Sequence, residues 1–232
     1  MISTLDLRLE EATSHSWGHI EFITALTQDE KIYRDNRRTN RLRKAAKLRQ
    51  EASFERVDFT AKRNITKAMV RDLMELRFIK DSRNVLLLGP TGVGKTFMAC
   101  AIGDHACRNG YSCKFMGMNF LIESISLARV EGSYLKFRDR LIKIDLLVLD
   151  DLGIKPLPSQ TIEDLYDILE ERYQNKSTII TSQLPLSNWR EVIDDDVAYE
   201  AIMDRLSHSA LKLEISGDSY RKRQVKARQL SN

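Results

Sequence analysis

The sequence predicts an α/β fold: a parallel sheet flanked by helices, preceded by a small all-helical N-terminal domain. Two observations lead to this prediction. The first quarter of the chain has helical periodicity and a strong positive charge, and the rest alternates short apolar segments with helical segments. A glycine-rich loop directly follows the first apolar segment. With 232 residues, the chain has room for one large domain and a small appendage.

The N-terminal region is predicted to be helical because apolar side chains recur every three or four residues from Leu5 to Leu26. Between Lys31 and Gln50 there are nine basic residues and one acidic residue, whereas the whole chain has a net charge of only +4. The segment Gln50–Phe59 breaks the helical pattern and is expected to be a linker. We therefore expect domains at residues 1–58 and 59–232.

The second region is predicted to contain a parallel sheet. Its short apolar segments are separated by helical stretches, as expected when crossover helices cover both faces of a sheet. The expected strands are Asn84–Leu88, Cys113–Met116, Ile144–Leu149, Thr178–Thr181 and Leu211–Ile215.

The composition argues against a membrane protein and against a disulfide scaffold. No unbroken apolar run approaches the length of a membrane span, and the first 30 residues contain no apolar block typical of a secretion signal. The three cysteines form no CxxC pair, so we expect buried thiols and a reducing cytoplasm.

The strongest motif is a phosphate-binding loop of the form G-x-x-x-x-G-K-[ST], between a predicted strand and a predicted helix. Its glycines allow successive backbone N–H groups to point at phosphate oxygens, beside the positive end of the helix. Lys95 is expected to reach the β and γ phosphates of a nucleotide, and Thr96 to bind Mg²⁺. The motif consists of Gly89, Pro90, Thr91, Gly92, Val93, Gly94, Lys95 and Thr96.

Two adjacent acidic residues follow a later buried strand, 55 residues beyond Lys95. Asp150 is expected to hold Mg²⁺ through water, and Asp151 to act as the general base, although its side chain is shorter than a glutamate. The polar residues after Thr178–Thr181 would lie beside the γ-phosphate if the two strands are neighbours. Ser182 is then a candidate for orienting the attacking water, and the alternative is a serine that merely ends the strand.

Other classes of phosphate-loop protein fit less well. Asn175-Lys176 lacks the acid that completes the guanine-reading motif of GTPases, and no L-S-G-G-Q motif of a transporter ATPase is present.

The motifs together resemble the IstB-like ATP-binding proteins, which are helper ATPases of insertion-sequence transposition within the AAA+ class and are related to DnaC-type helicase loaders. The resemblance extends from about Ser53 to about Lys222, and the basic N-terminal region is similar in character. Met1 lies somewhat late for the family, so a few N-terminal residues are expected to be missing. The shared motifs are the phosphate loop, L-L-V-L-D-D, I-I-T-S-Q-L-P, M-D-R-L-S-H and D-S-Y-R-K.

The resemblance implies roles for two arginines. Arg205 matches the arginine finger that enters the ATP site of the neighbouring subunit, and Arg221 matches the sensor-2 arginine that contacts nucleotide in its own subunit. From the residues alone, either arginine would be a surface ion-pair partner. A finger acting between subunits implies an ATP-dependent homo-oligomer, a ring or a spiral.

Two basic segments are candidates for DNA binding with little sequence specificity, because cations at helical spacing can contact several phosphates. A solvated helix face is the alternative for each. The candidate residues are Arg37, Arg38, Arg41, Arg43, Lys44, Lys47 and Arg49 in the first segment, and Lys136, Arg138 and Arg140 in the second.

The resemblance thus implies a cytoplasmic ATPase that uses ATP and Mg²⁺, assembles on and deforms double-stranded DNA, recruits and stimulates the element's transposase, and disassembles on hydrolysis. The alternatives are a replicative-helicase loader acting with single-stranded DNA, and a nucleotide-gated DNA-binding regulator with negligible turnover.

Overall fold

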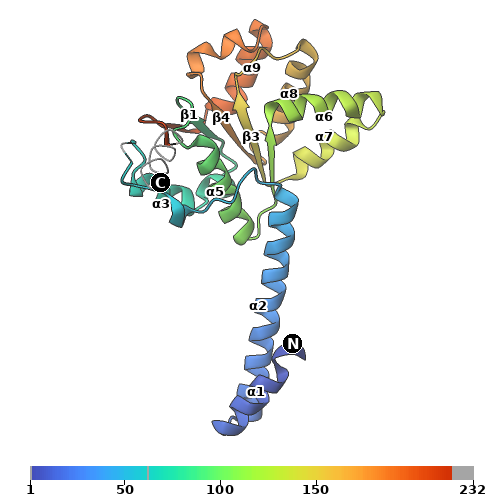
Figure 1. The fold of residues 1–232 in the computed structure, drawn as a ribbon. Coiled ribbons are helices and arrows are strands. Elements are labelled where there is room, and N and C mark those ends of the chain that lie inside the picture. Colours follow the sequence, from blue (N-terminus) through green and yellow to red (C-terminus); the bar gives the residue numbers. More distant parts are fainter. Residues whose placement is uncertain (1, 62, 221–232) are drawn as a thin grey trace, which may run out of the picture.

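The N-terminal region is a helical hairpin that projects from the rest of the molecule. In the computed structural model, which describes residues 2–61 and 63–220, helix α1 (Ile2–Ser14) lies against the N-terminal half of the long helix α2 (His19–Ala46) (Figure 1). Arg8 fastens the two helices, because its guanidinium donates hydrogen bonds to both carboxylate oxygens of Asp29 at 2.8 and 2.9 Å. The predicted helical character of this region is confirmed.

The segment after α2 is irregular, apart from one 3-10 turn, η1 (Phe54–Arg56), and it packs tightly. Ala52, Phe54 and Val57 are buried in the same apolar cluster as the end of α2 and the helix after the phosphate loop. The expected linker is therefore anchored to the surface of the sheet domain along much of its length. The domain boundary at residue 58 stays a prediction.

The sheet has five parallel strands in the order β2-β3-β4-β1-β5, which confirms the predicted α/β class. All five segments expected to be strands are strands. Their bounds are β1 (Val85–Leu88), β2 (Cys113–Gly117), β3 (Leu146–Leu152), β4 (Ser177–Ser182) and β5 (Leu211–Glu214). Because β3, β4 and β1 are neighbours, the carboxyl ends of these three strands meet at one edge of the sheet, where polar residues follow each strand.

Helices cover both faces of the sheet (Figure 1). These helices are α3 (Lys67–Met74), α4 (Arg77–Lys80), α5 (Lys95–Arg108), α6 (Met118–Val130), α7 (Tyr134–Lys143), α8 (Ser159–Arg172), η2 (Leu186–Glu191) and α9 (Asp196–Ser207). Alternate side chains of one strand enter opposite cores: Val85 and Leu87 pack with α3, α4 and α5, whereas Leu86 and Leu88 pack with α6, α8 and α9.

Two further observations concern the sequence expectations. The three cysteines, Cys100, Cys107 and Cys113, are free and buried, as expected. Within the described ranges, no helix combines the length and the apolar character needed to cross a membrane.

Candidate nucleotide site

The phosphate loop connects β1 to α5, as predicted, and its glycines are required by the C-terminal segment that lies against it. A Cβ at Gly89 would come within 1.9 Å of the carbonyl oxygen of Ile215, and a Cβ at Gly92 would come within 2.2 Å of the hydroxyl of Ser219. Both glycines also have positive φ, +137° and +85°. The backbone N–H of Tyr220 donates to the carbonyl of Gly92 at 2.9 Å. The segment that ends at Tyr220 thus forms part of the site.

Lys95 is folded into the loop. Its ammonium group donates hydrogen bonds to the carbonyls of Gly89 at 2.7 Å and Pro90 at 2.9 Å, and the residue is 5% exposed. Val93 is fully buried and anchors the loop to the core. A lysine held at the mouth of the loop is placed to contact the phosphates of a nucleotide, which are stronger acceptors than the two carbonyls.

Asp150 is the centre of the acidic part of the site. Its carboxylate is fully buried, and its Oδ1 accepts hydrogen bonds from the hydroxyls of Thr96 at 2.9 Å and Thr181 at 2.7 Å. The structure therefore brings together the two residues predicted to hold Mg²⁺, although they are 54 positions apart. A hydroxyl and a carboxylate are the hard oxygen donors that Mg²⁺ prefers, and the arrangement fits this ion.

Asp151 lies beside Asp150 because the strand bulges there. Its φ of +65° is unusual for a residue other than glycine, and the register between β3 and β4 shifts between Leu149 and Leu152. The backbone N–H of Asp151 donates to the hydroxyl of Thr181 at 2.9 Å. The bulge places both adjacent carboxylates at the site, whereas a regular strand would point them to opposite faces.

Ser182 is placed elsewhere than expected. Its hydroxyl is buried and donates to the carbonyl of Leu152 at 2.7 Å, so it holds the end of the strand together. The residues on either side face the site: Thr181 contacts Asp150, and the side-chain carbonyl of Gln183 accepts a hydrogen bond from the hydroxyl of Thr91. Strand alternation is the physical reason, and applied to Thr181-Ser182-Gln183 it would have identified these two neighbours from the sequence.

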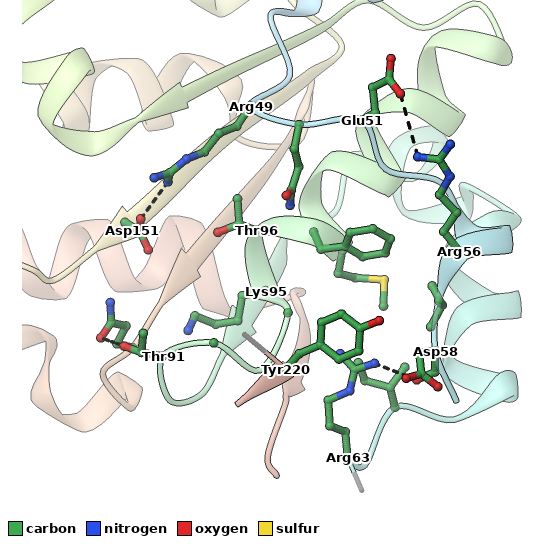
Figure 2. A pocket seen from close by; sticks show the side chains of 18 residues that line it. Arg49, Glu51, Arg56, Asp58, Arg63, Thr91, Lys95, Thr96, Asp151 and Tyr220 are labelled. Atoms are coloured by element: carbon green, nitrogen blue, oxygen red, sulfur yellow. Dashed lines mark hydrogen bonds and ion pairs between the residues drawn. The ribbon is translucent and has the colours of Figure 1, made fainter. Parts of the chain in front are cut away.

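The loop opens into a cavity of about 520 Å³, large enough for a small-molecule ligand (Figure 2). Its apolar wall is formed by residues from the anchored segment and from α5. These are Val57, Ile65, Phe97 and Met98. Such a wall, next to a phosphate cradle, suits a flat nucleobase.

Arg63 and Tyr220 line the same cavity and were not found from the sequence. The guanidinium of Arg63 donates to the carbonyls of Val93 at 2.9 Å and Asp58 at 2.7 Å, and it lies 5.2 Å from the centre of the Tyr220 ring. Figure 2 shows Tyr220 between the loop and Arg63. The Nε of Arg63 is buried without a hydrogen-bond partner among the described residues. Tyr220 belongs to the D-S-Y-R-K motif and Arg63 to no motif, and the two residues meet only through the fold.

Arg205 does not line the cavity of its own chain. It lies on α9, where its guanidinium contacts Glu170 of α8 and Asp204 and lies 5.4 Å from the ring centre of Tyr173. These contacts raise the pKa of the Arg205 guanidinium, with the hydrogen bond to Glu170 as the main cause. Arg221, the expected sensor-2 residue, lies outside the described residues.

The structure divides the seven DNA-binding candidates of the first basic segment, on α2 and just after it, into two groups. Three of them are engaged within the molecule: Arg38 donates to the carbonyl of Gly110 at 3.0 Å, Arg43 pairs with Asp104 at 2.5 Å, and Arg49 reaches the nucleotide site. The other candidates are exposed on the helix or at its end. They are Arg37, Arg41, Lys44 and Lys47.

The second basic segment forms α7. Burial lowers the pKa of Lys114 on β2, and the positive charges of Lys47 and Arg140 lower it further, which places each of these two cations within electrostatic reach of Lys114. Lys136 and Arg140 are exposed, whereas Arg138 is partly buried. Lys114, which no sequence motif marks, thus lies within electrostatic reach of one cation from each basic segment.

Arg49 is the clearest departure from the sequence expectation. Predicted to bind DNA, it donates hydrogen bonds from Nη1 to Oδ2 of Asp150 at 3.0 Å and to Oδ2 of Asp151 at 3.1 Å. Figure 2 shows the contact with Asp151. These two hydrogen bonds raise the pKa of the Arg49 guanidinium, and the hydrogen bond to Asp150 has the larger effect. Arg49 therefore belongs to the nucleotide site.

Comparisons with known proteins agree with this geometry. The chain is 38% identical over 216 residues to a putative insertion sequence ATP-binding protein, y4pL, of Sinorhizobium fredii, covering 93% of this chain and 88% of that protein. Among solved structures it is similar to DnaI, with a TM-score of 0.61 and 24% identity over 73% of this chain and 92% of that one. It is also similar to the DnaC helicase loader, with a TM-score of 0.52 and 25% identity over 64% of this chain and 92% of that one.

The family model described as IstB-like ATP binding protein matches residues 1–228. The expected family is confirmed, and with it an ATP-binding fold of the AAA+ class. The chain belongs to the IstB-like ATP-binding proteins of insertion sequences, a family of ATPases.

Proposed function

We propose that this chain is the helper ATPase of a transposition system, working in the cytoplasm. Its ATP-bound oligomer assembles on and deforms double-stranded DNA, recruits and stimulates the cognate transposase, and comes apart on hydrolysis. The observation that carries the DNA part is the nearness of Lys47 and Arg140 to Lys114, because the basic surface that these three residues would form combines cations from three elements. Closely spaced cations bind a phosphate backbone chiefly through counterion release, without base readout.

The site supports ATP hydrolysis by positioning. The backbone amides of Gly92 to Thr96 would hold the phosphates, and Lys95 would transfer its hydrogen bonds from the loop carbonyls to phosphate oxygens. Thr96 and Asp150 would hold Mg²⁺, which neutralises charge on the β and γ phosphates. The apolar wall of the cavity would receive the base.

The attacking water would be activated between β3 and β4. Asp151 is the candidate general base, and Gln183, tied to Thr91 of the loop, is better placed than Ser182 to orient the water. Arg205 would supply its charge to the site of a neighbouring subunit, since its contacts within the chain are to α8. Hydrolysis would then depend on oligomerisation.

A strand-transfer assay with the transposase encoded by the same element tests this proposal. With ATP or a non-hydrolysable analogue, the wild-type chain is expected to stimulate joining of the element's ends to a duplex target, and Lys95→Ala is expected to be inactive. Equal stimulation without nucleotide, or by Lys95→Ala, would contradict the proposal.

A helicase loader is the second candidate, favoured by the structural similarity to the DnaC helicase loader. A loader would prefer single-stranded DNA and would bind a replicative helicase. Preference for the duplex together with stimulation of strand transfer would therefore exclude it.

A further inference from the structure

Arg49 brings a positive charge from the end of α2 into the acidic part of the nucleotide site. Its Nη1 lies 3.0 Å from Oδ2 of Asp150 and 3.1 Å from Oδ2 of Asp151. The Asp150 side chain is fully buried, whereas the Arg49 side chain is 54% exposed. The arginine can therefore leave for solvent without uncovering the core, but the aspartate cannot move away.

Three donors surround the carboxylate of Asp150. Thr181 donates to Oδ1, and the one hydroxyl hydrogen of Thr96 serves Oδ1 at 2.9 Å or Oδ2 at 3.2 Å. Arg49 donates to Oδ2 and is the charged and exposed donor of the three. A Mg²⁺ ion held near Asp150 through water would compete with this guanidinium, because the two positive charges repel each other.

The fold fixes the position from which Arg49 reaches the acids. Leu48 packs on α5 so closely that a Cβ at Gly103 would come within 2.9 Å of its Cδ2. Ala46 and Ala52, on either side, are buried at 0% and 6% exposure. The backbone on both sides of Arg49 is thus anchored, and the contact with the acids is set by packing.

We propose that Arg49 is a built-in competitor of Mg²⁺ at Asp150, so that the magnesium–nucleotide complex binds only when the guanidinium releases this carboxylate. The competition rests on the proposed nucleotide site. Because Arg49 lies two residues after Lys47, the competition would link the end of the basic helix α2 to the occupancy of the nucleotide site.

The first test is the Mg²⁺ requirement of nucleotide binding, measured by the fluorescence of a mant-labelled, non-hydrolysable ATP analogue on the full chain. Arg49→Gln is expected to reach half-saturation at roughly 3- to 10-fold lower Mg²⁺ than wild type, since the competing cation is gone. Arg49→Lys keeps the charge and is expected to lie between the two. Arg34→Gln is the matched control, because it removes an exposed positive charge from α2, the helix that leads to Arg49, and Arg34 pairs there with Glu30.

The second test needs no nucleotide. Mg²⁺ alone is expected to raise the Tm of Arg49→Gln more than that of wild type or Arg34→Gln, because the variant leaves two acids without a cation. The inference would be overturned if Arg49→Gln needs as much Mg²⁺ as wild type or more, or if Mg²⁺ shifts the Tm of both proteins equally. In that case nucleotide binding by wild type would still leave the proposed function standing. No nucleotide binding by wild type at any Mg²⁺ concentration would overturn both.

Discussion

The hydroxyl of Thr181 lies 2.7 Å from Oδ1 of Asp150 and donates a hydrogen bond to it. The same hydroxyl accepts the backbone N–H of Asp151 at 2.9 Å. One side chain at the end of β4 therefore orients both acids at the end of β3. The position of the acids in the site depends on the neighbouring strand as well as on their own.

Thr181→Val, which keeps the shape and removes the hydroxyl, is expected to lower ATP turnover or Mg²⁺ affinity about 10- to 100-fold, as is typical when the partner of a metal-site carboxylate is lost. Thr181→Ser is the matched control and is expected to retain most of the activity. Steady-state ATPase kinetics over a range of Mg²⁺ concentrations measure the effect. Wild-type kinetics in Thr181→Val would contradict the role of this hydroxyl.

Gln183 and Ser182 can be separated by their effects on kcat and stability. Gln183→Ala is expected to lower kcat about 10-fold or more with little change in Tm, because its side chain faces the phosphate loop. Ser182→Ala is expected to lower Tm mainly, because its hydroxyl binds the carbonyl of Leu152. If Ser182→Ala instead lowers kcat and Gln183→Ala lowers only Tm, Ser182 is the residue that orients the water.

Arg205 is expected to act across a subunit interface. Arg205→Ala should bind nucleotide normally and lose about 10³-fold or more in hydrolysis, the range of an arginine finger. A mixture with Lys95→Ala, which has an intact finger but a defective loop, should regain part of the activity. If the mixture is as inactive as its components, Arg205 does not act between subunits.

We expect basic residues that look alike in the sequence to differ in how much they contribute to duplex binding. Lys47→Gln, Lys114→Gln and Arg140→Gln are each expected to weaken duplex binding and to reduce the salt slope by about 1. Arg43→Gln is the control, because Arg43 is paired with Asp104 within the molecule. An equal loss in all four variants would mean that overall charge, and not the basic surface around Lys114, binds DNA.

Replacing the buried Arg172 is expected to lower the stability of the fold strongly. It is 1% exposed, and its guanidinium donates to the carbonyls of Leu141 and Ile144, both at 2.7 Å, and to that of Ser177 at 2.5 Å. Burial lowers its pKa to about 9. Arg172→Leu leaves these carbonyls unpaired and is expected to cost about 3–5 kcal/mol of the free energy of unfolding, measured by urea denaturation. Exposed Arg71→Leu is the control, and similar values for both would contradict this role.

The sequence was sufficient for the features that depend on local pattern. The phosphate loop, the acid pair and all five strands follow from motif spacing and hydrophobic periodicity, which act over a few residues. The contacts of Arg49, Arg63 and Tyr220 could not be predicted in this way, because each depends on segments distant in the chain being packed together. In the sequence, Arg49 resembles the basic residues of α2. It differs from them because the helix ends at Ala46, so that Arg49 lies beyond the helix and reaches the acids.

The measurement that tests the account most directly is fluorescence anisotropy of labelled duplex and single-stranded DNA. Wild type and Lys95→Ala would each be titrated with Mg²⁺ and a non-hydrolysable ATP analogue, with ADP, or without nucleotide, at several salt concentrations. We expect wild type to bind the duplex tightly and in a salt-sensitive way only with the analogue, and Lys95→Ala to show no increase in duplex affinity when the analogue is added. Binding that is the same in all nucleotide states, or that favours the single strand, would contradict it.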